Sequence, residues 1–252
     1  GNFTNWQCRT GKVLATGGIN NIDWTGSVQV NDRHTIIKAA DAKTDLYGKF
    51  PEVSPNGKGY SVRLGNGDVY AEAESITYIY DIPVNTATFS ISYNYAVVFQ
   101  NPGHEFFEQP RFRANVYNVT DNVLIDCVSF DFTSAASLPG FKISSADPTV
   151  LYKDWTPVTL DLAVYAGKRI KLEFITSDCT FEAHFGYAYV DVSSNCSGTF
   201  NGNIICEGDK TVSLTAPFGF KSYQWFSNNS FLQEISNQQI LTLDPLPAAG
   251  SI

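Results

Sequence analysis

The sequence of 252 residues contains no methionine and no apolar run long enough to cross a membrane. A chain without methionine is not an untouched translation product, so we expect a mature form or an excised piece of a longer protein. A membrane-spanning segment needs roughly 20 consecutive apolar residues, so none is predicted. Basic residues are also scarce, since 17 Lys and Arg stand against 25 Asp and Glu, a formal net charge of −8. That deficit argues against nucleic acid, whose phosphates select clustered cations, and against an anionic membrane surface.

Motifs of enzymes and of zinc fingers are absent as well, since neither C-x-x-C nor G-x-S-x-G occurs. Residues 104–108 (HEFFE) approach the pattern H-E-x-x-H, but that zinc motif needs a second histidine and a helix that turns both ligands to one metal. Here the fifth residue is Glu, and prolines bracket the run. His34 and His184 are interpreted as polar anchors at strand ends, with a functional role as the alternative. Without an acid–base or nucleophile constellation, the chain is predicted not to be an enzyme.

What the sequence does contain is apolar alternation with a period of two. One face of the segment 88–99 carries only large aliphatic and aromatic side chains: Phe89, Ile91, Tyr93, Tyr95, Val97 and Phe99. Such alternation is typical of a half-buried strand. Further strands are predicted at 76–82, 112–116, 123–132, 158–162, 170–174 and 185–192, with turn residues between them. No stretch keeps a helical period, so the fold class is all-β, an antiparallel β-sandwich. The first 70 residues are interpreted mainly as long surface loops.

A domain boundary is predicted near residues 193–206. The strand 185–192 closes the first unit, and a polar connection then leads to a new strand at 211–215 and to Trp225. A Trp about ten residues after a strand is typical of an immunoglobulin-like sandwich, where the indole fills the core. We therefore predict a domain at 1–194, followed at 195–252 by part of an immunoglobulin-like β-sandwich. That second domain is expected to be truncated, because the fold needs about 100 residues.

An ordered series of short motifs carries a family resemblance. It comprises GYSVRLGN (59–66), AEAE (71–74), ITY (76–78), YNYAVV (93–98), QPR (109–111), YKDW (152–155) and HFGYAYVD (184–191). The series resembles jelly-roll domains of very large secreted proteins of gliding Bacteroidetes. CEGD (206–209) through YQW (223–225) is similar to the immunoglobulin-like domains that follow them. The resemblance implies export by the type IX secretion machinery and display on the outer cell surface.

The five cysteines are an odd number, so at least one is unpaired within the chain. Cys196 and Cys206 flank a short polar loop, which suits a disulfide in an oxidising compartment, with buried free thiols as the alternative. In the resembling domains a Cys often stands where this chain has Ser54, and it pairs with the Cys that matches Cys8. The resemblance therefore implies that Cys8 is the odd thiol, and Cys127 with Cys179 is predicted as the second bridge.

An acidic residue, Asp191, ends the aromatic stripe of the strand 185–192. A buried carboxylate needs partners, and carbohydrate-binding jelly rolls often hold a structural calcium ion near the closing strand. Calcium takes six to eight oxygens, so Asp191 needs further ligands. These are predicted from an acidic cluster and one amide: Asp68, Glu72, Glu74 and Asn2. The alternative is a strand-end Asp that is only hydrogen-bonded.

Four aromatic residues of the N-terminal part are candidates for sugar stacking: Trp6, Trp24, Tyr47 and Tyr60. A pyranose stacks on a flat, exposed ring beside polar groups, and polar residues abound nearby; ordinary packing is the alternative. The sequence thus predicts a non-enzymatic segment of a large secreted cell-surface adhesin that attaches to glycans or surfaces during gliding. An accessory carbohydrate-binding module of a secreted polysaccharide-degrading enzyme is the alternative.

Overall fold

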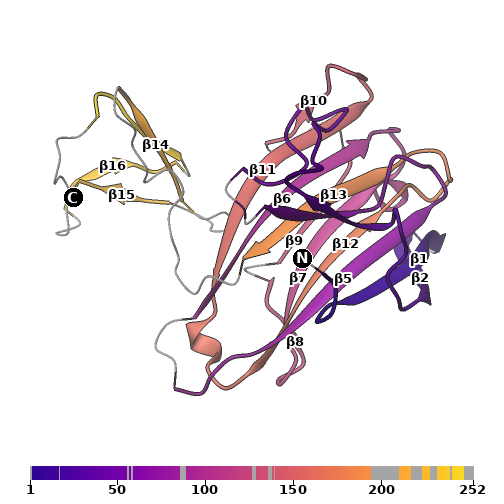
Figure 1. Cartoon of the computed structure of the whole chain (residues 1–252), viewed down its shortest axis with the longest axis horizontal. Helices are drawn as coiled ribbons and strands as arrows, with labels where there is room; N and C mark the ends of the chain where they lie inside the picture. Colours follow the sequence, from indigo (N-terminus) through magenta and orange to yellow (C-terminus); the bar gives the residue numbers. More distant parts are fainter. Residues whose placement is uncertain are drawn as a thin grey trace.

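The computed structural model describes residues 2–16, 18–55, 57, 59–85, 89–126, 129–135, 138, 140–193, 210–216, 223–227, 232–238 and 240–246. The larger part is a β-sandwich, and the all-β prediction is confirmed (Figure 1). Its strands are β1 (Gln7–Thr16), β2 (Ile19–Gly26), β3 (His34–Lys38), β4 (Tyr60–Leu64), β5 (Glu72–Asp81), β6 (Ser90–Gln100), β7 (Arg111–Asn118), β8 (Val123–Leu124), β9 (Phe130–Thr133), β10 (Lys142–Ile143), β11 (Val150–Asp161), β12 (Arg169–Ser177) and β13 (Gly186–Ser193). Two short 3-10 turns are η1 (Phe106–Glu108) and η3 (Ala163–Tyr165).

Two antiparallel sheets form the sandwich. The seven-stranded sheet has the order β2-β1-β5-β12-β7-β8, with β9 also paired to β7. The six-stranded sheet has the order β10-β11-β6-β13-β4-β3. From β4 to β7 and again from β11 to β13, each successive strand lies in the other sheet, which is the winding of a jelly roll.

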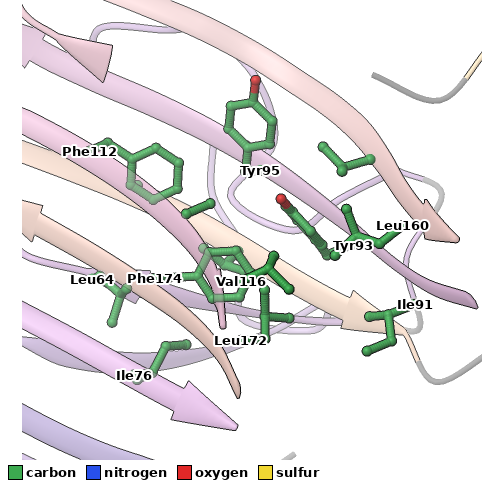
Figure 2. Packing of buried hydrophobic residues seen from close by; sticks show 14 of the residues in the cluster. Leu64, Ile76, Ile91, Tyr93, Tyr95, Phe112, Val116, Leu160, Leu172 and Phe174 are labelled. Atoms are coloured by element: carbon green, nitrogen blue, oxygen red, sulfur yellow. The ribbon is translucent and has the colours of Figure 1, made fainter. Parts of the chain in front are cut away.

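The core lies between the sheets, and the face predicted for β6 points into it. Its buried side chains are Ile91, Tyr93, Tyr95, Val97 and Phe99, none more than 2% exposed. Figure 2 shows the rings of Tyr93 and Tyr95 of β6 together with those of Phe174 and Phe112 of the opposite sheet. The ring centroids of Tyr93 and Phe174 of β12 are 4.9 Å apart, and those of Tyr95 and Phe112 of β7 are 5.6 Å apart. The period-two pattern therefore identified the core face of this strand correctly.

The first 70 residues differ from the prediction, because they contain four strands rather than mainly loops. β1 and β2 form a hairpin at the edge of the seven-stranded sheet, and β3 and β4 form the edge of the six-stranded sheet. In β2 only Asn20 is buried, and every other residue is partly or fully exposed, so polar residues are tolerated along most of the strand. A strand at the edge of a sheet with one solvent-exposed face has a weak apolar pattern, so the sequence pattern did not reveal these strands.

Two of the predicted strands also changed in extent. The segment predicted at 123–132 is divided into β8 and β9, which pair with opposite ends of β7. The strand predicted at 158–162 is the second half of the longer β11, which begins at Val150. Val150, Leu151 and Lys153 are buried in that first half. Burial on both faces removes the alternation that the prediction relied on.

Beyond the sandwich, the described residues form two small sheets. β14 (Val212–Thr215) pairs with β17 (Ile240–Leu243), and β15 (Trp225–Phe226) pairs with β16 (Glu234–Ser236). The strand expected at 211–215 corresponds to β14. Trp225 is partly buried, and its Nε1 donates to Gln238 O at 2.7 Å. The immunoglobulin-like assignment of this part, and the boundary at residue 194, stay predictions.

Residues 1–194 should fold without the rest of the chain, because in the described part no strand of the two large sheets pairs with β14–β17. We expect this piece, expressed alone, to retain a β-sheet circular dichroism spectrum and to melt in one cooperative transition. An expanded, protease-sensitive product would show instead that the C-terminal part completes the core.

Candidate functional site

The outer face of the six-stranded sheet carries the aromatic stripe that the sequence predicted. Tyr187 and Tyr189 of β13 lie there, next to Ala96 and Val98 of β6, in a second apolar cluster. Both tyrosines are at most 5% exposed, so something covers them.

The cover is the connection between β3 and β4, residues 39–59. Phe50 of this connection packs edge-on against Tyr189 with ring centroids 5.7 Å apart. The indole Nε1 of Trp155 donates to Pro51 O at 2.7 Å, which ties the connection to β11. The connection also carries Tyr47, whose ring lies 5.2 Å from that of Phe185. Tyr47 is therefore part of the cover and not an open platform for sugar.

Asp45 fastens this cover to the sheet. Its Oδ2 accepts hydrogen bonds from the hydroxyls of Tyr187 (2.8 Å) and Tyr189 (2.9 Å). Its Oδ1 accepts from the amides of Tyr47 (2.9 Å) and Gly48 (2.6 Å). Burial, followed by the adjacent Asp45 charge, raises the pKa of both Tyr187 and Tyr189, so these hydroxyls remain donors. The two tyrosines are structural, and this face of the sheet is closed.

Asp45→Ala should destabilise the sandwich by about 3 kcal/mol, because it leaves two buried hydroxyls and two amides without their acceptor. Denaturant unfolding measures the loss, and trypsin cleavage at Lys43 and Lys49 measures the release of the cover. Asp41→Ala is the matched control, since Asp41 is an exposed acid of the same connection. Equal stability and equal cleavage in the two variants would contradict the fastening role.

An open pocket of about 130 Å³ lies where the N-terminal segment meets β4 and β13. It unites four residues that the sequence had named for two separate roles: Asn2, Trp6, Tyr60 and Asp191. Trp6 precedes β1, Tyr60 begins β4, and Asp191 lies near the end of β13. β13 pairs with β4, which places Asp191 and Tyr60 at the same end of the sheet. Residues that the sequence had named for two separate roles thus line one cavity, while the Asp191 carboxylate itself lies against Gly57 of the connection between β3 and β4.

The residues that line the pocket differ in solvent exposure and in the side chains that they pack against. Trp6 is half-buried and packs edge-on against Tyr78 with ring centroids 5.1 Å apart. Tyr60 is 41% exposed, whereas Asp191 is only 7% exposed. A Cβ at Gly57 would clash with the Asp191 carboxylate, so the absence of a side chain at Gly57 makes room for it. The carboxylate lies deep, and the Tyr60 ring stands at the solvent.

Trp24 does not join this pocket. It lies on β2, where the Arg9 guanidinium stacks 4.6 Å from the centre of its ring. Of the four aromatic candidates, the structure therefore brings together only Trp6 and Tyr60.

Glu72 and Glu74 lie at a different place, around Arg33. The Arg33 Nε is 2.6 Å from Glu74 Oε1 and 3.5 Å from Glu72 Oε1. Arg33 Nη2 also donates to the carbonyls of Gly11 (2.9 Å) and Ala73 (3.0 Å). A protein cation thus already neutralises part of this acidic cluster.

Asp178 is a member of the cluster that the sequence analysis missed. Its two carboxylate oxygens accept from the amides of Gly186 (3.0 Å) and Glu72 (3.0 Å). Burial, reinforced by the charge of Glu74, raises the pKa of Asp178 to about 8. The one available signal was a polar Ser-Asp pair directly after a strongly apolar strand, which marks a strand end but not its partners.

Asp191 lies far from these acids, so Asp68, Glu72 and Glu74 do not join it in one calcium site as predicted. Glu74 lies beside the start of β13, where its Oε2 is next to Gly65 and Tyr187. Asp191 follows Gly186 by five residues on the same strand, a distance of about 16 Å in an extended chain. Asp68 stays near Glu72, because both bond to Asn66. Whether this chain binds calcium stays a prediction.

Glu74 should make stability depend on pH. Burial is the main cause that raises the pKa of Glu74 from its ordinary value of 4.5 to about 7. The folded state therefore holds this proton more tightly, so the stability contributed by Glu74 is present below pH 4.5 and is lost as the pH rises to about 7. We expect Glu74→Gln to remove a change on the order of 3 kcal/mol between these pH values, measured by urea unfolding. The same pH slope in both proteins would contradict this assignment.

The cysteines only partly follow the predicted pairing. Cys8 is a free buried thiol, and so is Cys179, which was predicted to pair with Cys127. Cys127, Cys196 and Cys206 themselves lie outside the described residues, and the bridge between the last two stays a prediction.

Among the histidines, His34 is a structural anchor, as interpreted from the sequence. It is fully buried, with Nε2 3.2 Å from Ser75 O, and its Nδ1 accepts from the amide of Val30 at 3.3 Å. Burial lowers the pKa of His34. Residues 104–108 are an extended segment followed by the 3-10 turn η1, so they do not have the helix that the H-E-x-x-H motif requires.

No known protein family and no curated protein sequence matches this chain. Among solved structures it is similar to the carbohydrate-binding module TmCBM61 in complex with β-1,4-galactotriose (TM-score 0.39, 8% identity, 77% of this chain and 92% of that chain). It is also similar to carbohydrate-binding modules from the β-sandwich superfamily (TM-score 0.32, 9% identity, 76% and 56%). A further similar structure is the K2 cleaved adhesin domain of Lys-gingipain (TM-score 0.27, 16% identity, 64% and 86%). At these scores, the function has to be argued from the site itself.

The described residues contain no helix long and apolar enough to cross a membrane.

Proposed function

We propose that this chain is a non-catalytic glycan-binding β-sandwich module whose binding site is the pocket of Asn2, Trp6, Tyr60 and Asp191. The observation that carries the proposal is that these four residues line one pocket. Aromatic rings offer apolar faces to the C–H groups of a pyranose. A carboxylate accepts hydrogen bonds from sugar hydroxyls, and an amide both donates and accepts. The pocket therefore holds both kinds of group that recognise a sugar.

The shape of the site favours one sugar unit over a long chain. Its volume of about 130 Å³ is below the ~300–1,000 Å³ of pockets that enclose larger ligands. The outer face of the six-stranded sheet, on which an extended polysaccharide can lie in an open sandwich, is covered by residues 39–59. The proposed ligand is thus a chain end or a branch. The net charge of −8 favours neutral over acidic glycans.

We place this module in a large secreted adhesin on the outer cell surface, exported by the type IX machinery. The ordered motif resemblance supports that setting, and glycan attachment during gliding is the role it implies. An accessory carbohydrate-binding module of a secreted polysaccharide-degrading enzyme is the second candidate, because the same pocket serves both.

Binding to a glycan array of neutral oligosaccharides should identify a ligand, and Tyr60→Ala should weaken its affinity about 30-fold, the effect of losing roughly 2 kcal/mol at a central contact. Asp191→Asn should weaken it similarly, because the anionic acceptor is lost. Titration calorimetry with the best array ligand measures both. Trp24→Ala is the control, since Trp24 is an aromatic residue outside the pocket, and it should bind normally.

Two outcomes would contradict the proposal. One is a ligand whose affinity falls with Trp24→Ala and not with Tyr60→Ala. The other is the absence of binding across the array by a folded chain.

A further inference from the structure

Two connections at the Gly186 end of β13 bring three metal-ligating side chains together. His104 belongs to the connection between β6 and β7, and Cys179 and His184 belong to the connection between β12 and β13. One ligand atom of each lies within 4.8 Å of the others. Across the described part of the chain, no other three His, Cys, Asp or Glu side chains meet this criterion.

The spacing suits one tetrahedral ion. Cys179 Sγ lies 3.4 Å from His184 Nδ1. Zinc bonds of about 2.3 Å to sulfur and about 2.0 Å to nitrogen, at a tetrahedral angle, separate these atoms by about 3.5 Å. The His104 and His184 rings are 5.2 Å apart at 82°, and the Nδ1 of His104 is buried without a hydrogen-bond partner among the described residues. A buried imidazole nitrogen rarely lacks a partner, and a metal ion would supply one.

The backbone holds these side chains in place. The Cys179 amide donates to His184 O at 2.9 Å, which closes the turn that faces the thiol toward the imidazole. The Thr180 amide donates to Glu108 O at 3.1 Å and joins the two connections. Phe181 packs edge-on against His104 with ring centroids 4.9 Å apart. The ligand atoms are thus positioned by contacts that do not involve a metal.

Three other roles for these side chains account for fewer of the observed contacts. A catalytic thiol must reach its substrate, but Cys179 is fully buried. A disulfide is excluded by the free state of Cys179. A hydrogen-bonded Cys–His pair accounts for Cys179 and His184 and leaves the buried nitrogen of His104 unexplained.

The geometry points to a zinc site formed by His104, Cys179 and His184. Thiolate and imidazole ligands together favour zinc among the common divalent ions. The thiol of Cys179 releases its proton to solvent when the metal–sulfur bond forms. Three protein ligands leave a fourth position for water, and both histidines are only half-buried, so this position is open to solvent. The ion would tie the two connections together, independently of sugar binding at the opposite end of β13.

The test uses the full untagged chain, reduced and freed of metal with a chelator, and Co²⁺ as the spectroscopic probe. We expect one Co²⁺ per chain, with the visible bands of a tetrahedral site and a near-ultraviolet thiolate-to-metal charge-transfer band. Cys179→Ser should abolish the charge-transfer band. His104→Gln and His184→Asn should weaken Co²⁺ and Zn²⁺ binding more than about 100-fold. Loss of a residue that only hydrogen-bonds to a metal ligand weakens metal binding by about 10- to 100-fold.

Cys8→Ala and Glu105→Gln are the controls, a second buried thiol and an acid next to His104, and both should keep the full spectrum. Circular dichroism shows whether each variant is folded. If Cys179→Ser does not fold, His104→Gln decides the outcome, because His104 is only half-buried and its replacement should leave the fold intact. The proposal is overturned by a chain that gives no tetrahedral spectrum or by unchanged affinity in His104→Gln. A disulfide at Cys179 in the mass map of the native protein overturns it as well.

Discussion

Tyr93 and Tyr95 of β6 lie at the centre of the sandwich, where rings from both sheets meet, and the positions of the candidate sites depend on this contact. Each is at most 1% exposed, and they contact Phe174 and Phe112 of the opposite sheet. Large aromatic side chains bury more apolar area than any others, so their face of β6 must point inward. Because side chains alternate along a strand, that choice also determines which residues of β6 and its partner β13 point outward.

The outward-facing residues of β13 show the consequence. Tyr187 and Tyr189 can satisfy their hydroxyls only if an acceptor reaches them, and Asp45 does so from the connection between β3 and β4. The same connection brings Phe50 onto the sheet, which closes the broad face. The two candidate sites lie instead at the two ends of β13. One end has the pocket with Asp191, and the other has the cluster of His104, Cys179 and His184.

Buried charge is concentrated around Arg33, between the two sheets. Arg33 pairs with Glu74, while Asp178 close by accepts two backbone amides. Removing several charges from water is costly unless they are paired or neutralised. Burial raises the pKa of both Glu74 and Asp178 toward neutrality, so protonation relieves part of this cost. The cluster therefore does not need a metal ion to be tolerated in the fold.

The sequence by itself determined the all-β class and the core face of β6, because alternation is a local pattern that survives wherever one face is wet and the other is dry. It failed for β1 and β2, where the pattern is weak at a sheet edge, and for the first half of β11, which is buried on both faces. It named Trp6, Tyr60 and Asp191, but assigned them to separate sites. Only the tertiary structure decided that these three residues line one pocket, that Asp191 is remote from Glu74, and that Cys179 lies beside two histidines. Such meetings depend on strand order and register between distant segments, which no local sequence pattern encodes.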